Sequence, residues 1–176
     1  MTKFGYTLMT EQSGPKDLVR YAISAEDRGF DFEVCSDHFS PWLTSQGHAP
    51  NAWAVLGAVA NATEQVDLYT YVTCPTMRYH PAIVAQQAAT VEILADGRFT
   101  LGLGSGENLN EHVVGKGWPT RLRRCDAICA YRRRRREHSL ADPTWMRSWT
   151  PSDPVGRPGS PMWRWSRSVA RRRTDF

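Results

Sequence analysis

The fold of this chain is decided by residues 66–104, which read VDLYTYVTCPTMRYHPAIVAQQAATVEILADGRFTLGLG. Residues 66–73 alternate in polarity and are rich in β-branched and aromatic side chains, which predicts a strand. His80-Pro81 opens a helix with apolar side chains at helical spacing, and Asp96-Gly97 ends it. Residues 99–104 predict the next strand. A strand, a helix and a strand in this order build a parallel sheet with a right-handed crossover.

The same alternation precedes this stretch. Strands are expected at residues 3–7 and 32–36, a helix between Pro15 and Gly29, and a second helix over residues 52–62. The chain therefore predicts an α/β fold with four parallel strands. Two architectures remain open on this pattern, an open doubly wound sheet and part of an eight-stranded (β/α) barrel.

In both architectures, ligand-binding residues lie just past the carboxyl ends of the strands. Groups that can transfer protons or form hydrogen bonds follow every predicted strand of this chain. In chain order they are Thr10 and Glu11; Asp37, His38 and Trp42; Cys74, Thr76, Arg78 and Tyr79; and Ser105, Glu107 and Asn108. This convergence predicts a functional site at one edge of the sheet.

Two motifs in this set point to chemistry. Asp37-His38 places a carboxylate beside an imidazole, which suits a general base, although a polar loop has the same composition. The glycine-rich run 102–107 departs from the dinucleotide-binding fingerprint, because Glu107 stands where the third glycine should be. This run suits a tight turn or the close passage of a flat cofactor along backbone that lacks Cβ atoms. Trp42 follows Pro41 in a loop with no evident core face.

Three motifs in order, 36–42 (SDHFSPW), 73–81 (TCPTMRYHP) and 102–111 (GLGSGENLNE), resemble the luciferase-like (β/α)8 oxidoreductases that use the deazaflavin coenzyme F420. The resemblance is to the branch related to F420-dependent glucose-6-phosphate dehydrogenases and covers residues 3–119. It implies a barrel and hydride transfer between the deazaflavin and a CH–OH donor, a small-molecule substrate. An FMN-dependent monooxygenase of the same barrel is the enzyme alternative. The resemblance also implies a homodimer for the intact enzyme.

The resemblance assigns roles to particular residues. His38 would take the proton from the substrate hydroxyl, Trp42 would pack at the reacting centre, and Glu107 would address a ring nitrogen of the cofactor. Asp37 would bind the cofactor and help to position His38, and Glu11 would lie near the substrate.

The remaining positions implied by the resemblance concern the cofactor. A non-prolyl cis peptide is expected at Tyr71–Val72, behind the cofactor ring, and Gly106 belongs to the cofactor-binding set. Cys74 stands where the dehydrogenases have a cofactor-contacting Thr, which leaves that contact in doubt.

The net charge of +4 averages over two unlike parts of the chain. Residues 1–120 hold 7 basic and 13 acidic side chains, whereas residues 121–176 hold 15 and 5, and all 15 of these basic residues are Arg. The tail also carries four of the seven Trp residues. We therefore expect residues 1–119 to form the N-terminal half of a barrel, followed over 120–176 by a tail that is unrelated to the family.

Three hypotheses explain the composition of the tail. They are a basic nucleic-acid-binding extension, a natural disordered tail, and the product of out-of-frame translation of a GC-rich gene. The abundance of Arg, Pro, Ser and Trp without Lys, Asn or Gln favours the frameshift, and with it a truncated, inactive chain. Specific binding of nucleic acid is not expected.

The chain shows no apolar run of transmembrane length and no signal-peptide pattern, so we expect a cytoplasmic protein without metal or disulfides.

Overall fold

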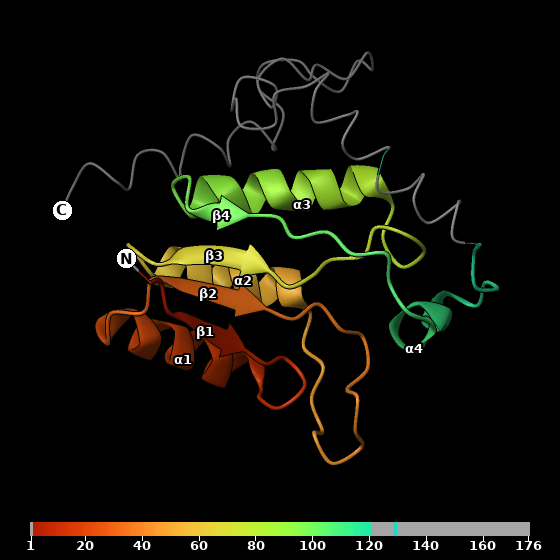
Figure 1. Cartoon of the computed structure of the whole chain (residues 1–176), viewed down its shortest axis with the longest axis horizontal. Coiled ribbons are helices and arrows are strands. Elements are labelled where there is room, and N and C mark those ends of the chain that lie inside the picture. The colour runs from red at the N-terminus through yellow and green to blue at the C-terminus, as the bar shows by residue number, and fades with distance from the viewer. Residues whose placement is uncertain (1, 121–128, 130–176) are drawn as a thin grey trace, which may run out of the picture. The chain divides into compact units, whose positions relative to one another are not determined.

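The structure, a computed structural model, describes residues 2–120 and residue 129 and has the expected order of elements (Figure 1). Its strands are β1 (Gly5–Leu8), β2 (Phe32–Cys35), β3 (Asp67–Thr70) and β4 (Phe99–Thr100). Its helices are α1 (Pro15–Asp27), α2 (Ala52–Ala62), α3 (Pro81–Leu94) and the short α4 (Asn108–Glu111), which a 3-10 turn follows at His112–Val114. The strands form one parallel sheet in the order β1-β2-β3-β4, which confirms the predicted class and strand number.

One face of the sheet carries the core. Leu8, Cys35 and Leu68 have no exposed surface, and they pack in one cluster with Leu18 of α1 and Val59 of α2. Burying an aliphatic side chain of this size contributes about 1.5–3 kcal/mol. A slip of one residue in register would turn these side chains to the opposite face, so the core fixes the register.

The other face of the sheet carries Phe32, Val34 and Tyr69, and each of these side chains is only half-buried. The rings of Phe32 and Tyr69 meet edge to face, with their centroids 5.7 Å apart. In a closed (β/α) barrel, this face would point to the interior.

The last two strands are shorter than the sequence predicts, because a side chain takes over the pairing at their ends. The hydroxyl of Thr70 accepts the backbone N–H of Gly102 at 2.9 Å and lies 3.0 Å from the Gly102 carbonyl oxygen. Beyond it the peptide bond Tyr71–Val72 is cis, and parallel pairing reappears only as an isolated bridge between Thr73 and Leu103.

Side chains and glycines mark the helix ends, and those of α3 lie at the predicted His80-Pro81 and Asp96-Gly97. Asn51 caps α2 by accepting the N–H of Ala54 at 3.0 Å, and His80 caps α3 through its ring nitrogen. Gly97, after α3, has a φ of +89°, a conformation that favours glycine. No helix in the described part of the chain is long and apolar enough to cross a membrane. Apart from residues 120 and 129, the tail predicted at 120–176 lies outside the described residues.

Candidate active site

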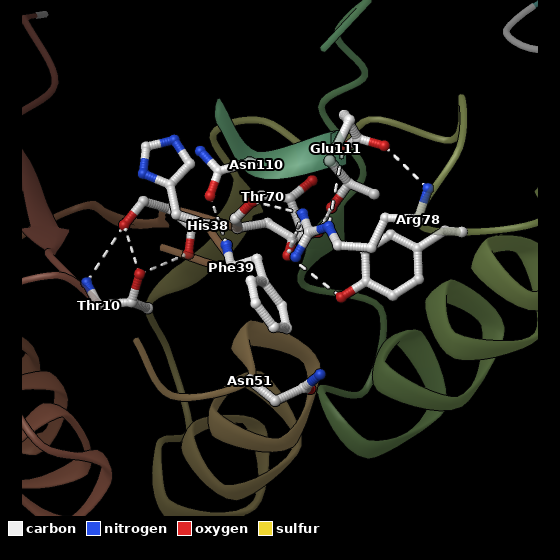
Figure 2. Close-up of polar contacts among 12 residues, drawn as sticks. Thr10, His38, Phe39, Asn51, Thr70, Arg78, Asn110 and Glu111 are labelled. Carbon is white, nitrogen blue, oxygen red and sulfur yellow. Dashed lines mark hydrogen bonds and ion pairs between the residues drawn. The ribbon is translucent and has the colours of Figure 1, made fainter. Parts of the chain in front are cut away.

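The polar side chains that follow the four strands gather at one end of the sheet, and Figure 2 shows Thr10, His38, Arg78, Asn110 and Glu111 in this region. The parallel strands point their carboxyl ends to the same edge, so residues far apart in sequence converge there. The candidate site has three parts: the contact between Glu11 and His38, the buried carboxylate of Asp37, and the glycine-rich loop over residues 102–107.

Glu11 and His38 form the acid–base pair. The Oε1 atom of Glu11 contacts the Nδ1 atom of His38, and the Glu11 side chain is buried. Its Oε2 atom accepts the hydroxyl of Ser36 at 2.8 Å and lies 3.4 Å from the Thr10 hydroxyl. The carboxylate is therefore held on two sides, and the His38 side chain beside it is 19% exposed.

Asp37 follows β2 and has three side-chain partners. Its buried carboxylate accepts the hydroxyl of Thr73 at 2.8 Å on Oδ2, and Arg78 Nη2 at 3.1 Å and the Tyr79 hydroxyl at 3.3 Å on Oδ1. Burial, together with the negative charge of Asp37, raises the pKa of Tyr79 to about 12, so the phenol stays protonated and donates. The carboxylate that contacts the His38 ring is that of Glu11, and the roles expected for Asp37 in cofactor binding and in positioning His38 stay predictions.

Trp42 lies beside His38. Its side chain is 55% exposed, and its ring meets the imidazole edge to face with centroids 5.3 Å apart. The indole therefore lies outside the core and offers an exposed apolar surface beside the imidazole.

The glycine-rich loop packs directly on the segment after β3. A Cβ added at Gly104 would lie 2.6 Å from Val72 Cγ2 and 3.1 Å from Cys74 Sγ, so the close approach of the loop to these two side chains requires this glycine. The cis peptide Tyr71–Val72 expected from the resemblance is present, and the Tyr71 side chain is 70% exposed. Packing within the protein is thus sufficient to explain why residue 104 is a glycine.

Cys74 lies close to Gly106 of this loop. Cys74 is buried, and a Cβ added at Gly106, whose φ is +74°, would lie 3.4 Å from Cys74 Cβ. Burial, followed by the negative charges of Glu111 and Glu107, raises the pKa of the Cys74 thiol to about 12. The thiol therefore stays protonated and is no nucleophile at neutral pH.

Glu107 is held by a residue that the sequence analysis did not single out. Its Oε1 atom accepts the amide of Asn110 at 2.5 Å, and the amide oxygen of buried Asn110 accepts the backbone N–H groups of Phe39 and Ser40, both at 2.7 Å. Asn110 thereby ties the loop after β4 to the loop that carries His38 and Trp42. Glu107 immediately precedes α4, and its i,i+3 spacing to Asn110 was the signal available for this pair.

Glu111 is the second residue that was missed. It is buried, and its Oε2 atom accepts the N–H groups of Met77 and Arg78 at 3.2 and 2.8 Å. Among the described residues, no cluster of His, Cys, Asp and Glu is arranged to hold a metal ion.

The arrangement is that of an α/β protein whose polar site lies at the carboxyl ends of parallel strands, where barrel enzymes carry their active sites. The family model of luciferase-like monooxygenases matches residues 1–160. The chain therefore belongs to the luciferase-like family, as the resemblance predicted.

Known relatives agree with this assignment. An F420-dependent glucose-6-phosphate dehydrogenase of Beutenbergia cavernae is 51% identical over 119 residues, which make up 68% of this chain and 35% of that protein. The chain thus spans about a third of the length of this relative.

Solved structures give the same fold. An F420-dependent secondary alcohol dehydrogenase in complex with an F420-acetone adduct is 37% identical, with a TM-score of 0.72 over 90% of this chain and 45% of that one. The oxygenating constituent of the 3,6-diketocamphane monooxygenase from Pseudomonas putida, in complex with FMN, has a TM-score of 0.59 over 73% of this chain and 38% of that one. At 18% identity it shares the fold alone.

Proposed function

We propose that residues 1–119 form the N-terminal half of a barrel and carry its part of the active site, which we call the half-site. The intact enzyme would be an oxidoreductase that transfers hydride between the deazaflavin F420 and the CH–OH group of a small substrate. The observation that carries the proposal is the buried Glu11 carboxylate on the His38 ring, next to exposed Trp42. Among the relatives described above, those at 37% and 51% identity are F420-dependent, and this supports F420 over FMN. FMN remains the alternative cofactor of the same fold.

The described residues fit a flat ring system. The loop around Gly104 and Gly106 presents backbone without side chains, next to the cis-bonded Tyr71–Val72 segment. The Cys74 thiol is protonated and buried beneath this loop, so it adds no charge under an aromatic ligand. When bound, the deazaflavin would supply the carbon that accepts or gives up hydride.

His38 is the general base of the proposal. As hydride leaves the substrate carbon, the hydroxyl proton passes to the ring nitrogen of His38 that does not contact Glu11. The imidazole gains a positive charge in this step, and the Glu11 carboxylate on Nδ1 stabilises it. The indole of Trp42 lies edge to face with the imidazole and covers part of it.

Glu107 and Asp37 take the remaining roles. Glu107 addresses the polar edge of the ring, with its carboxylate oriented by Asn110. Asp37 acts through its contacts with Thr73, Arg78 and Tyr79, which hold the segment before His38. The substrate contacts of the intact enzyme, and its homodimer, would involve residues beyond this half-site.

We also retain the proposal that residues 120–176 arise from out-of-frame translation. The match to the Beutenbergia relative spans 119 residues, about the length of the N-terminal part defined by charge, whereas the match to the family model continues to residue 160. Sequencing the gene around codon 120 tests this proposal. If neither alternative frame encodes an amphipathic fourth helix, the tail is a genuine part of the protein.

The proposed cofactor is tested by titrating the purified chain with F420 and following the deazaflavin fluorescence, with FMN as competitor. We expect saturable F420 binding that FMN displaces poorly. Glu107→Gln is expected to weaken binding, whereas Glu64→Gln, an exposed carboxylate at the opposite end of the sheet, is the matched control. Stronger binding of FMN than of F420 would favour the monooxygenase alternative.

A further inference from the structure

Arg78 joins two buried carboxylates that belong to different elements (Figure 2). Its Nη2 atom donates to the Oδ1 atom of Asp37 at 3.1 Å and to the Asp37 carbonyl oxygen at 2.8 Å. On the other side, its Nε atom faces Glu111 Oε1 at 3.6 Å. The Arg78 side chain is 10% exposed, and its guanidinium lies over the Tyr79 ring at 4.6 Å. One planar group therefore links the end of β2 to α4.

The bond to the Asp37 carbonyl matters most for the site. This oxygen belongs to the peptide group that joins Asp37 to His38, and a peptide group is planar. A donor fixed on that oxygen also fixes the orientation of the His38 backbone nitrogen, and hence the direction in which the imidazole leaves the chain. Arg78 in this way acts on His38 without touching its ring.

Glu111 fixes the opposite side of Arg78. Its Oε2 atom accepts the N–H of Arg78 itself, the N–H of Met77 and, at 3.3 Å, the hydroxyl of Thr76. Charge-assisted bonds to a buried carboxylate are about twice as strong as neutral ones, so the backbone that carries Arg78 is held firmly. The loop after β3, α4 and the Asp37–His38 segment form one unit.

Resting on the proposed deazaflavin-dependent function, we propose that Arg78 is a positioning residue that sets the orientation of the His38 and Trp42 rings through the Asp37 carbonyl group. Lysine at this position would keep the positive charge. It lacks the planar fork of donors that reaches Asp37 while facing Glu111.

Arg98 provides a matched control within the same sheet. Its Nη1 atom donates to the Val66 carbonyl at 2.6 Å, and its Nη2 atom donates to the carbonyls of Thr63 and Ala60 at 2.8 and 3.2 Å. Arg98 directly precedes β4 and so lies at the opposite end of the strands from His38. Both arginines hold backbone carbonyls, but only Arg78 holds one beside the proposed base.

The experiment compares Arg78→Lys with Arg98→Lys in the full chain. The NMR signals of the His38 and Trp42 rings are recorded without cofactor, the urea midpoint of unfolding is measured, and the affinity for F420 is obtained by titration. We expect both variants to lower the midpoint. Only Arg78→Lys should shift the ring signals and weaken F420 binding, by about tenfold, as expected for one lost charge-assisted hydrogen bond. Glu111→Gln should shift the same ring signals in the same sense.

Unchanged ring signals in folded Arg78→Lys, or equal shifts in both lysine variants, would overturn the positioning role and leave Arg78 as a purely structural residue. If Arg78→Lys does not fold, unchanged ring signals in Glu111→Gln overturn it equally. The ring signals need no cofactor. A wild-type chain that fails to bind F420 would therefore reject the proposed function without deciding the role of Arg78.

Discussion

The carboxylate of Glu11, which follows β1, contacts the Nδ1 atom of His38, which follows β2. The two residues come from neighbouring parallel strands, and Ser36 and Thr10 hold the carboxylate in place. This contact gives the imidazole a defined direction and a counter-charge, which are the two properties that a histidine base needs.

The Glu11–His38 contact makes a prediction about the tautomer of the imidazole. In the wild-type chain, neutral His38 should carry its proton on Nδ1, facing Glu11. Glu11→Leu removes the acceptor and should shift the neutral ring toward the Nε2-protonated form, as measured by long-range ¹H–¹⁵N NMR. Ser36→Ala removes a bond to Glu11 and leaves the carboxylate in place, so it should preserve the tautomer. Equal tautomer populations in wild type and Glu11→Leu would contradict the pairing.

Glu33 predicts a loss of stability as the pH rises. This β2 side chain is buried, and burial, with the charge of Glu26 adding to it and Arg98 opposing it, raises its pKa to about 7 from 4.5. Between these values the unfolded chain releases the proton before the folded chain does, so the free energy of unfolding falls from about pH 4.5 to about pH 7 and then levels off. Glu33→Gln should remove this decrease and be more stable than wild type at pH 8, by about 1 to 3 kcal/mol.

Urea unfolding of wild type and Glu33→Gln at pH 5 and pH 8 measures this difference. Asp67→Asn, which alters a half-exposed carboxylate paired with Lys3, is the control and should leave the decrease nearly intact. The same difference in stability between wild type and Glu33→Gln at both pH values would show that Glu33 ionises normally in the folded chain.

Gly104 and Gly57 should respond to alanine in opposite directions. A Cβ at position 104 would press on Val72 and Cys74, so Gly104→Ala should destabilise the chain by about 1–3 kcal/mol. Gly57 lies inside α2, and the nearest atom to an added Cβ is Leu94 Cδ1 at 3.9 Å, an ordinary contact. Gly57→Ala should therefore stabilise by about 0.4–1 kcal/mol, because it restricts the unfolded chain. Thermal unfolding of both variants tests this, and destabilisation by Gly57→Ala would contradict the packing around α2.

Trp42 should matter for ligand binding and little for stability. Its side chain is more than half exposed, so Trp42→Leu should change the free energy of unfolding by less than about 0.5 kcal/mol. Its place beside His38 predicts that F420 affinity falls about three- to tenfold, the usual value of one aromatic contact. Phe4→Leu alters another exposed aromatic ring, before β1, and should leave the affinity unchanged. Equal affinities for Trp42→Leu and wild type would remove Trp42 from the site.

Much of the fold was predictable because it depends on local patterns. The period of apolar residues located the four strands and three main helices, and the order of elements places His38 and Trp42 after the carboxyl end of β2, as predicted. The resemblance supplied the cis bond at Tyr71–Val72, which periodicity does not encode.

The parts that were missed depend on contacts between distant elements. The sequence places Asp37 next to His38, but it does not reveal that Glu11 contacts the imidazole while the Asp37 carboxylate binds Thr73. Asn110 and Glu111 bind loops that lie far away in sequence, and no local pattern reveals such partners. The strands also end early, because the Thr70 hydroxyl replaces ladder pairing with Gly102.

The central claim is that the strand ends of this chain form a deazaflavin half-site, and NMR mapping of F420 binding to the isotope-labelled chain tests it most directly. The titration is run at about 0.5 M salt, which screens nonspecific attraction between an anionic cofactor and the arginine-rich residues 121–176. We predict saturable shifts of the Gly104 and Gly106 amides and of the His38 and Trp42 rings, with the signals around Arg98 unchanged. Shifts confined to residues 121–176, or their disappearance at this salt concentration in a folded chain, would contradict the account.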